Sequence, residues 1–289
     1  MTTIGVAGSG DLAAFVARAL AKAHSVRIFD TDHGSPRCDG AEQADSVIGL
    51  AKAADVIVLC TDAEDAREAL LRNTDWLKGS SVVLDMGQGD PDVSRTISKD
   101  LSGIGITLVD APLHAEDTES ISQASAIFFG GPAAVLNSVR PILEAICPKV
   151  IHCGDAGSGH AMRLVVTAIA ACNRLITYEC AAMGARNGLT IADMATVLNK
   201  SSGYNSASAR VLPALAANGR TADATVGDCA NDLRKASALG MRYGAPMLLA
   251  TMVRSTLDAA SNRLGESATI DALAKIWEID AGLPASGSD

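Results

Sequence analysis

The sequence has no cluster of Lys or Arg residues, and this absence narrows the partners that the protein can have. Over 289 residues, 24 Lys and Arg are outnumbered by 33 Asp and Glu, which gives a formal net charge of -9 at pH 7. Binding to a polyanion requires a concentrated basic surface. We therefore expect neither nucleic acid nor an anionic membrane as the main partner.

The chain also lacks a CxxC motif and a set of metal ligands at the usual spacing. Its seven cysteines are scattered along the sequence, which is typical of reduced core thiols in a cytosolic protein. His24, His33 and His152 have no carboxylate or second histidine at metal-ligand spacing. The sequence therefore predicts no metal site.

No apolar run is long enough to cross a bilayer. The longest one of interest, 164–172, is flanked by Arg163 and Arg174. A basic segment followed by an apolar one does not precede the first predicted strand, so we expect no secretory signal and a cytoplasmic location. The content of 48% hydrophobic residues is ample for the cores of one large domain or two ordinary ones.

What the sequence does contain, at its start, is the dinucleotide-binding fingerprint. A predicted strand runs into a glycine turn and then into a helix predicted over 12–22. In that context Gly8 allows a tight turn, Gly10 lets the backbone approach a pyrophosphate, and the small Ala13 lets the helix pack on the sheet. The free N–H groups of the helix N-terminus favour phosphate. The residues predicted to bind cofactor here are Gly8, Ser9, Gly10, Asp11 and Leu12.

The second predicted strand ends in Asp30, about twenty residues beyond the glycines, where a carboxylate accepts both ribose hydroxyls of an adenosine. A 2′-phosphate would meet a negative charge there, and neither Thr31 nor Asp32 is a cation. The sequence therefore favours NAD over NADP. Arg37 is close enough in sequence to be the residue that would hold a phosphate instead.

Alternating strands and helices predict a doubly wound sheet up to about residue 154, and helices alone follow it. The near-continuous apolar character of the strands is typical of a parallel sheet covered on both faces. We expect an α/β Rossmann domain over 1–155 and an all-α domain over 156–289, joined by a long helix predicted over 160–186. The predicted strands are 26–30, 56–60, 82–85, 107–110, 126–129 and 150–153, and the later helices are 190–198, 205–215, 226–241, 247–264 and 270–279.

Several helices of the second half carry apolar residues on more than one face. Faces that one small layer cannot bury favour association, so we predict a homodimer, or a tetramer built from dimers, formed through residues after about 190.

A doubly wound sheet binds its ligand beyond the carboxyl ends of the strands, and this rule singles out further residues. Thr61, Asp62 and Gln88 follow strands and are predicted to contact the cofactor. His114 also follows a strand and could hydrogen-bond a substrate or move a proton, with a surface loop histidine as the alternative. Asp85 and Asp110, at strand ends, are interpreted as structural.

Five other residues matter at the junction and in the helical half. Arg163 is a cation in an apolar stretch, so it should face the ligand cleft, or else form a salt bridge to the sheet domain. For His160, three residues earlier, we expect a simple surface role. Tyr204, Asn205 and Asn231 are further candidates for the pocket.

Over residues 3–277 the chain resembles the β-hydroxyacid dehydrogenase family, which includes 3-hydroxyisobutyrate and 6-phosphogluconate dehydrogenases. The resemblance rests on Gly8–Ala13, Asp85–Gln88, the Asp110-Ala111-Pro112 loop, the glycine-rich 154–159 segment, Glu179 and Asn231-Asp232. It implies a Rossmann domain, a long interdomain helix and a helical domain that dimerises.

The chain departs from the family pattern where the chemistry takes place. Arg163 replaces the lysine that serves as general acid/base in the family, Thr167 replaces an asparagine, and His114 lies where a Ser-Gly-Gly segment grips the substrate carboxylate. Asn231 replaces a second lysine. Arginine stays protonated, so it can bind a carboxylate or stabilise an alkoxide but makes a poor general base.

The resemblance therefore implies an NAD-dependent oxidoreductase acting on a small carbonyl or hydroxy-acid-like substrate, with Arg163, Thr167, His114 and Asn231 at the substrate. Two alternatives remain open. One is an imine-reductase-like enzyme, because relatives of that kind replace the same lysine, and the other is a non-catalytic NAD(H)-binding protein.

Overall fold

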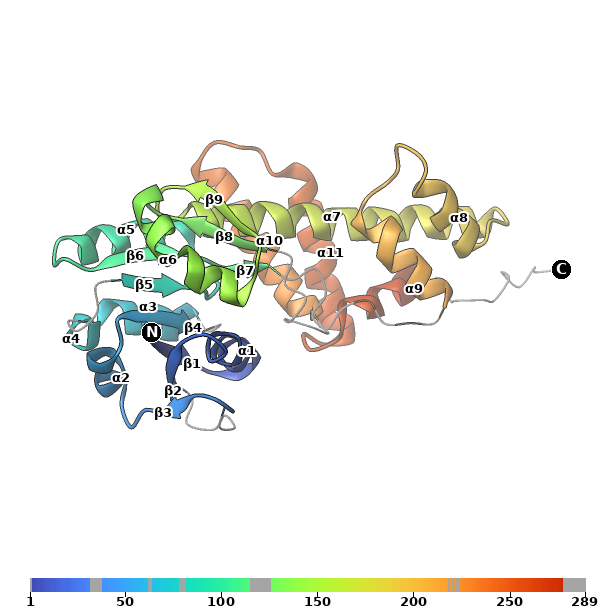
Figure 1. Cartoon of the computed structure of the whole chain (residues 1–289). Coiled ribbons are helices and arrows are strands. Elements are labelled where there is room, and N and C mark those ends of the chain that lie inside the picture. Colours follow the sequence, from blue (N-terminus) through green and yellow to red (C-terminus); the bar gives the residue numbers. More distant parts are fainter. Residues whose placement is uncertain are drawn as a thin grey trace. The chain divides into compact units, whose positions relative to one another are not determined.

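The computed structural model describes residues 2–31, 38–61, 64–77, 82–114, 126–217, 219, 221 and 224–277. These residues form two compact units, one up to Arg163 and the other from Leu164 onward (Figure 1). The division between them falls inside one long helix, whereas the boundary predicted from the sequence lies just before that helix, between residues 155 and 156.

Within the described residues the first unit contains a nine-stranded sheet with helices on both faces (Figure 1). The strands are β1 (Thr3–Gly8), β2 (Ser25–Asp30), β3 (Glu42–Gln43), β4 (Val56–Cys60), β5 (Val82–Asp85), β6 (Thr107–Asp110), β7 (Leu113–His114), β8 (Ala126–Gly130) and β9 (Val150–Gly154). The helices are α1 (Gly10–Leu20), α2 (Val47–Ala53), α3 (Glu64–Arg72), α4 (Thr74–Leu77), α5 (Pro91–Ser102) and α6 (Ala133–Ile146). The predicted doubly wound architecture is confirmed.

The sheet runs in the order β3-β2-β1-β4-β5-β6-β8-β7, with β9 paired to β8. The chain moves outward from β1 in one direction through β2 and then returns to β4 on the other side. The strand order therefore reverses between β1 and β4, which places the ligand site at the carboxyl ends of these two strands.

One expectation about the sheet is wrong in part. The pairings from β3 across to β6 are parallel, but β8 is antiparallel to both β6 and β7. An apolar run such as Ala126–Gly130 fits a buried strand of either direction, so composition alone did not reveal the reversal. The short elements β3, β7, α2 and α4 were also not predicted.

Alternate residues of each central strand pack into different cores, which explains why these strands are apolar throughout. On β4, Val56, Val58 and Cys60 join a core with α1 and α6, whereas Ile57 and Leu59 join a second core with α2, α4 and α5. All five side chains are buried. Both faces of the sheet are thus covered, as a parallel sheet requires.

The second unit is helical. It contains most of α7 (Ser158–Arg186), then α8 (Ile191–Leu198), a π-helix (Ala207–Val211), α9 (Leu212–Ala216), α10 (Val226–Arg242), α11 (Leu248–Leu264) and a 3-10 helix (Ile270–Trp277). By length and composition alone α7 could cross a membrane. Its buried face, however, supplies Leu164, Leu175 and Tyr178 to the core of this unit, as the core helix of a globular domain does.

Two predicted helices of the second unit take other forms. The helix expected over 205–215 starts as a π-helix, and the segment expected as a helix over 270–279 is a 3-10 helix in its described part. Just before the π-helix, the side-chain oxygen of Asn205 accepts the N–H groups of Ala207 (2.8 Å) and Ser208 (3.1 Å). This amide fixes the first turn before the helix begins.

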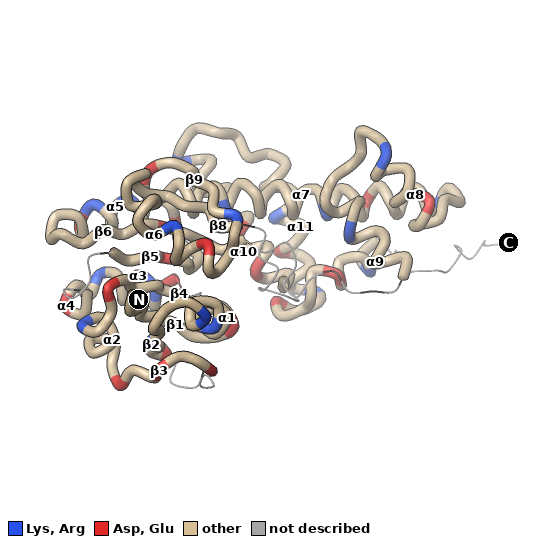
Figure 2. The backbone as a smooth tube through the Cα atoms, viewed as in Figure 1, with Lys and Arg blue, Asp and Glu red and all other residues tan. Residues whose placement is uncertain are grey.

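Lys and Arg are dispersed along the described backbone rather than gathered on one element (Figure 2). The distribution agrees with the sequence, which contains no basic cluster.

A partly buried network in the second unit generates a stability prediction. Nη1 of Arg174 on α7 lies 2.9 Å from Oδ1 of Asp271 and 3.2 Å from the Tyr178 hydroxyl oxygen, and it also reaches Thr221. The side chains of Arg174 and Asp271 are only 16% and 15% exposed. We expect Arg174→Ala to lower the free energy of unfolding by about 1–3 kcal/mol, because it leaves a carboxylate without its cation.

The matched control is Arg234→Ala in the same unit. Arg234 and Asp258 are 3.0 Å apart but 55% and 39% exposed, and exposed pairs contribute about 0–1 kcal/mol. Urea unfolding followed by circular dichroism measures both variants. Equal losses would show that Arg174 contributes no more than a surface charge.

Candidate functional site

The turn from β1 to α1 requires glycine at two positions, for different reasons. A Cβ at Gly8 would lie 2.0 Å from the carbonyl oxygen of Cys60, so only glycine lets β1 pass this close to β4. Gly10 has a φ of +69°, and a Cβ there would meet no described atom within 4 Å. The backbone at Gly10 therefore faces open space, as the approach of a pyrophosphate requires.

The first turn of α1 supplies the donors for such a ligand. Ser9 is the N-cap residue in an extended conformation, and within the described residues its side chain makes no capping hydrogen bond. Asp11 is exposed, Leu12 is half-buried, and Ala13 is buried against the sheet. The residues present thus fit a dinucleotide phosphate at this helix N-terminus.

Asp30 ends β2 directly beside the turn. It pairs in register with Gly8, and the N–H of Thr31 donates to the Gly8 carbonyl at 3.3 Å. The half-buried Asp30 carboxylate is therefore positioned where the fingerprint predicts a ribose contact. Asp62, predicted to bind cofactor, and Arg37, the candidate phosphate ligand, both lie outside the described residues.

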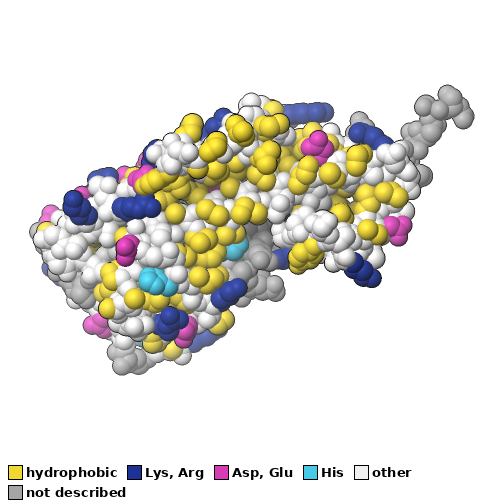
Figure 3. All heavy atoms as spheres, turned by 90° about the horizontal axis from the view of Figure 1, so that it is seen from above, with side chains coloured by type: hydrophobic (Ala, Val, Ile, Leu, Met, Phe, Trp, Pro, Cys, Tyr) yellow, Lys and Arg dark blue, Asp and Glu magenta, His cyan; other side chains and the backbone are white. Residues whose placement is uncertain are grey.

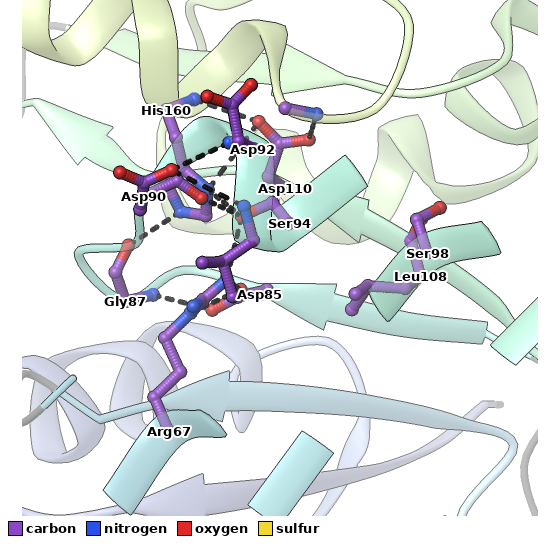
Figure 4. Close-up of polar contacts among 12 residues, drawn as sticks. Arg67, Asp85, Gly87, Asp90, Asp92, Ser94, Ser98, Leu108, Asp110 and His160 are labelled. Carbon is purple, nitrogen blue, oxygen red and sulfur yellow. Dashed lines mark hydrogen bonds and ion pairs between the residues drawn. The ribbon is translucent and has the colours of Figure 1, made fainter. Parts of the chain in front are cut away.

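A buried charged network lies beneath the end of β5 (Figure 4). Arg67 of α3 and Asp85 are both fully buried, and Nε and Nη2 of Arg67 are 2.7 and 2.5 Å from Oδ2 of Asp85. Nη2 also donates to the Ser94 hydroxyl at 2.9 Å. Burial lowers the pKa of Arg67, but Asp85, together with Glu64 and Glu68, raises it by more, so the net shift is upward.

The structural role predicted for Asp85 agrees with these contacts. Arg67 and Ser94 were not identified from the sequence. Arg67 lies among Glu64, Asp65 and Glu68, a composition typical of an exposed helix, and the available signal was its spacing of four residues from the buried Leu71.

Asp110, at the end of β6, caps the N-terminus of α7. Its Oδ1 accepts the N–H of Gly157 at 2.6 Å and its Oδ2 accepts the N–H of His160 at 2.8 Å. Burial raises the pKa of this carboxyl, while His160 and these N–H donors oppose the rise. The structural interpretation of Asp110 fits this arrangement.

The glycines just before and at the start of α7 permit this close packing. A Cβ at Gly159 would lie 2.3 Å from the Phe128 carbonyl oxygen, and one at Gly157 would lie 2.5 Å from that of Pro91. The glycine-rich segment therefore brings the start of α7 against the sheet.

His160 is fully buried, so the surface role expected for it is wrong. Its Nε2 lies 3.0 Å from the Gly87 carbonyl oxygen, which can only accept, and Nε2 must carry the proton. Nδ1 lies 2.9 Å from the Ser94 hydroxyl oxygen, whose single proton has two acceptors within reach, Nδ1 and the Asp90 carbonyl oxygen, also at 2.9 Å. Burial lowers the pKa of His160, more than Asp85 and Asp110 raise it, so the ring is neutral.

Arg163 follows one turn later on α7. It is 5% exposed and belongs to the first unit by its packing. Among the other predicted residues of this unit, Thr61 is buried at the end of β4 and Gln88 is exposed between the buried Gly87 and Gly89. His114 stacks on Phe128 with ring centroids 5.5 Å apart.

The remaining candidates belong to the second unit. Thr167 is half-buried, and its hydroxyl donates to the Leu164 carbonyl at 3.3 Å. Asn231 is exposed on α10 and accepts from Arg234 at 3.3 Å, and Tyr204 is 63% exposed. The amide of Asn205 is engaged in its own turn, a structural role that the sequence did not indicate.

Comparisons with known proteins agree with the fold and the turn. Residues 3–154 match the family model of the NAD binding domain of 6-phosphogluconate dehydrogenase. Residues 157–277 match the model described as NAD-binding of NADP-dependent 3-hydroxyisobutyrate dehydrogenase. A 3-hydroxyisobutyrate dehydrogenase of Pseudomonas aeruginosa is 29% identical over 223 residues, 71% of this chain and 72% of that protein.

Solved structures share the architecture. A 3-hydroxyisobutyrate dehydrogenase of Mycobacterium tuberculosis, solved with L-serine, superposes with a TM-score of 0.81 at 20% identity and covers 96% of this chain and 99% of its own. A variant imine reductase of Myxococcus stipitatus, solved with NAD+, gives a TM-score of 0.62 at 19% identity, with the same coverage.

The buried His160 predicts a pH dependence of stability. The folded state holds the ring neutral below the ordinary pKa of 6.5, whereas the unfolded chain takes up a proton there. The contribution of the neutral His160 to the free energy of unfolding is therefore complete above about pH 6.5. As the pH falls below this value, the contribution is lost by up to about 1.4 kcal/mol per pH unit. In His160→Gln the free energy of unfolding should fall less steeply over this range. Urea unfolding between about pH 5 and pH 7.5 measures both slopes, and identical slopes would contradict a neutral His160.

Proposed function

Because this chain belongs to the family of 6-phosphogluconate and 3-hydroxyisobutyrate dehydrogenases, we propose that it is an NAD(H)-dependent oxidoreductase that reduces a small carbonyl compound. The observation that carries the proposal is the Gly8–Ala13 turn beside Asp30, at the point where the strand order reverses. The bound nicotinamide supplies the hydride. The chain itself binds the phosphates at the N-terminus of α1 and the ribose at Asp30.

Arg163 indicates in which direction the proposed reaction runs. A guanidinium stays protonated, so it donates hydrogen bonds to a substrate carboxylate or to an oxygen that gains negative charge, and it does not accept a proton from an alcohol. The buried position of Arg163 strengthens such a contact, because little water competes for it. Reduction is therefore favoured over alcohol oxidation, with His114 of the same unit as a further substrate contact.

Imine reduction is the second candidate. Its support is the arginine at the position of the family's lysine, together with the shared fold of the imine reductase structure. Absorbance of NADH, followed against aldehydes, keto acids and cyclic imines, tests both activities. Turnover of imines alone would select the second candidate. Binding of NADH without turnover of any compound would indicate a non-catalytic NAD(H)-binding protein.

The cofactor preference is a first prediction. A 2′-phosphate beside the Asp30 carboxylate should weaken binding by about 1–2 kcal/mol, so we expect NADPH to bind at least about tenfold more weakly than NADH. Asp30→Asn should reduce this difference by strengthening NADPH binding. Fluorescence titration measures each Kd, with Asp100→Asn, an exposed acid on α5, as the control for net charge. Equal affinities in the unmodified protein would show that a cation such as Arg37 captures the phosphate.

Substitution of Arg163 tests the proposed chemistry. Arg163→Ala should leave the Kd for NADH nearly unchanged and lower kcat/KM by roughly 10²-fold or more, the effect of removing one charged donor. Arg163→Lys should introduce some alcohol oxidation, because lysine can give up its proton. Arg186→Ala, exposed at the last turn of α7, is the control. A lowered Tm of Arg163→Ala with unchanged kinetics would assign Arg163 a structural role.

We further propose that the second unit forms a homodimer, or a tetramer of dimers, with α7 joining the residues after about 190 that the sequence predicts at the interface. Apolar side chains cover much of the face of the molecule seen in Figure 3, and several helices of the second unit expose large apolar side chains, which is typical of an association surface. Those on α7 follow a spacing of three to four or seven residues, as a helix packed on another helix requires. On α7, α10 and α11 of this unit the exposed large apolar residues are Val165, Ile169, Ile176, Met183, Met241, Leu248, Leu249 and Met252.

Light scattering at micromolar concentration should give at least twice the mass of one chain. Ile169→Glu combined with Ile176→Glu should reduce this mass to that of one chain while circular dichroism still reports the helices, because two buried charges would oppose association. Ile104→Glu, at an exposed residue of the first unit, should change nothing. A monomeric unmodified protein would refute the proposal.

A further inference from the structure

Gly87, in the loop after β5, has both of its peptide groups fixed by buried side chains. Its N–H donates a hydrogen bond to Oδ1 of Asp85 at 3.2 Å. Its carbonyl oxygen accepts a hydrogen bond from Nε2 of His160 at 3.0 Å. A Cβ at Gly87 would lie 2.4 Å from the Thr61 carbonyl oxygen, so the loop also lies against the end of β4. These contacts restrain the backbone of the loop at Gly87.

The two side chains that fix Gly87 are themselves joined. Arg67 binds Asp85 on one side and the Ser94 hydroxyl on the other, and Ser94 binds Nδ1 of His160 (Figure 4). A Cβ at Gly89 would lie 2.5 Å from Cζ of Arg67, so the guanidinium lies directly beneath the loop. A closed ring of contacts thus links β5, α3, α5 and α7.

The order of the strands indicates which half of the cofactor the Gly87 loop contacts. Asp30 on β2 marks the adenosine end, and β5 lies on the opposite side of the reversal between β1 and β4. A dinucleotide laid across that point extends its nicotinamide half toward β4 and β5. Gln88, exposed between two buried glycines, is the side chain that the loop presents there.

We propose that His160 is a positioning residue for the nicotinamide half of the cofactor, acting through the Gly87 carbonyl. The inference rests on the proposed function, since it requires a dinucleotide at the strand ends. His160 donates its Nε2 proton to Gly87 and orients the loop, and Ser94 orients the ring. The adenosine half, held by the Gly8–Ala13 turn and Asp30, does not depend on this contact.

Two substitutions of His160 distinguish the role of Nε2 from that of Nδ1. The amide of a glutamine reaches the place of Nε2, so His160→Gln keeps the bond to Gly87. The shorter amide of an asparagine reaches only the place of Nδ1. His160→Asn therefore keeps the contact with the Ser94 hydroxyl but leaves the buried Gly87 carbonyl without its donor. His152→Asn is the matched control. Nε2 of His152, on β9, lies 2.8 Å from the Gly131 carbonyl oxygen, and β6 and β8 separate β9 from β5 in the sheet.

Isothermal titration calorimetry with NADH and with ADP-ribose measures the effect. His160→Asn should weaken NADH binding about tenfold, the effect of one unsatisfied buried carbonyl, and leave ADP-ribose binding within about twofold. His160→Gln and His152→Asn should bind both ligands as the unmodified protein does. Equal weakening of both ligands by His160→Asn, or no weakening of either, would overturn the proposal. An unmodified protein that binds ADP-ribose but gains nothing from the nicotinamide would instead refute the proposed function.

A measurement on the unmodified protein keeps the proposal testable if His160→Asn does not fold. In protein labelled with 15N-histidine, NADH should shift the Nε2 resonance of His160, assigned with His160→Gln, whereas ADP-ribose should not. Equal shifts with the two ligands would contradict a role specific to the nicotinamide half.

Discussion

The bond between the Asp110 carboxylate and the first N–H groups of α7 is the contact on which the arrangement of the site depends. It fixes the start of the longest helix to the end of β6 by two short hydrogen bonds, and the nearby glycines allow no side chain between them. His160 and Arg163 follow on the same helix, within one turn of each other. Their positions relative to the strand ends are therefore set by a carboxylate that need not touch a ligand.

The parts of the fold that depend on local pattern were predictable from the sequence. The strands of the first unit, the turn at Gly8–Ala13 and the acidic end of β2 are each determined by periodicity or by a short motif. The burial of Arg67 and His160 was not predictable, since a charged or titratable side chain is buried only when partners from distant elements meet it. Asp85 and Ser94 are such partners, and no local pattern pairs them.

Arg163 and the buried network represent opposite uses of charge in one unit. Arg67 is neutralised by Asp85 and also bound to Ser94, so these contacts hold structure. Arg163 lies beyond that network on α7, where the family has its reactive lysine. Under the proposed function, a guanidinium, which keeps its proton where a lysine can lose it, would favour reduction over alcohol oxidation.

The network around Gly87 also has a consequence for folding. The partners His160 and Gly87 are 73 residues apart in the chain, and His160 and Ser94 are 66 apart. Contacts of such sequence separation form only after the intervening chain has closed, at a cost in entropy that local helices do not bear. We therefore expect the start of α7 to dock after β5 and β6 have paired, and the Gly87 loop to acquire its shape among the last events of folding.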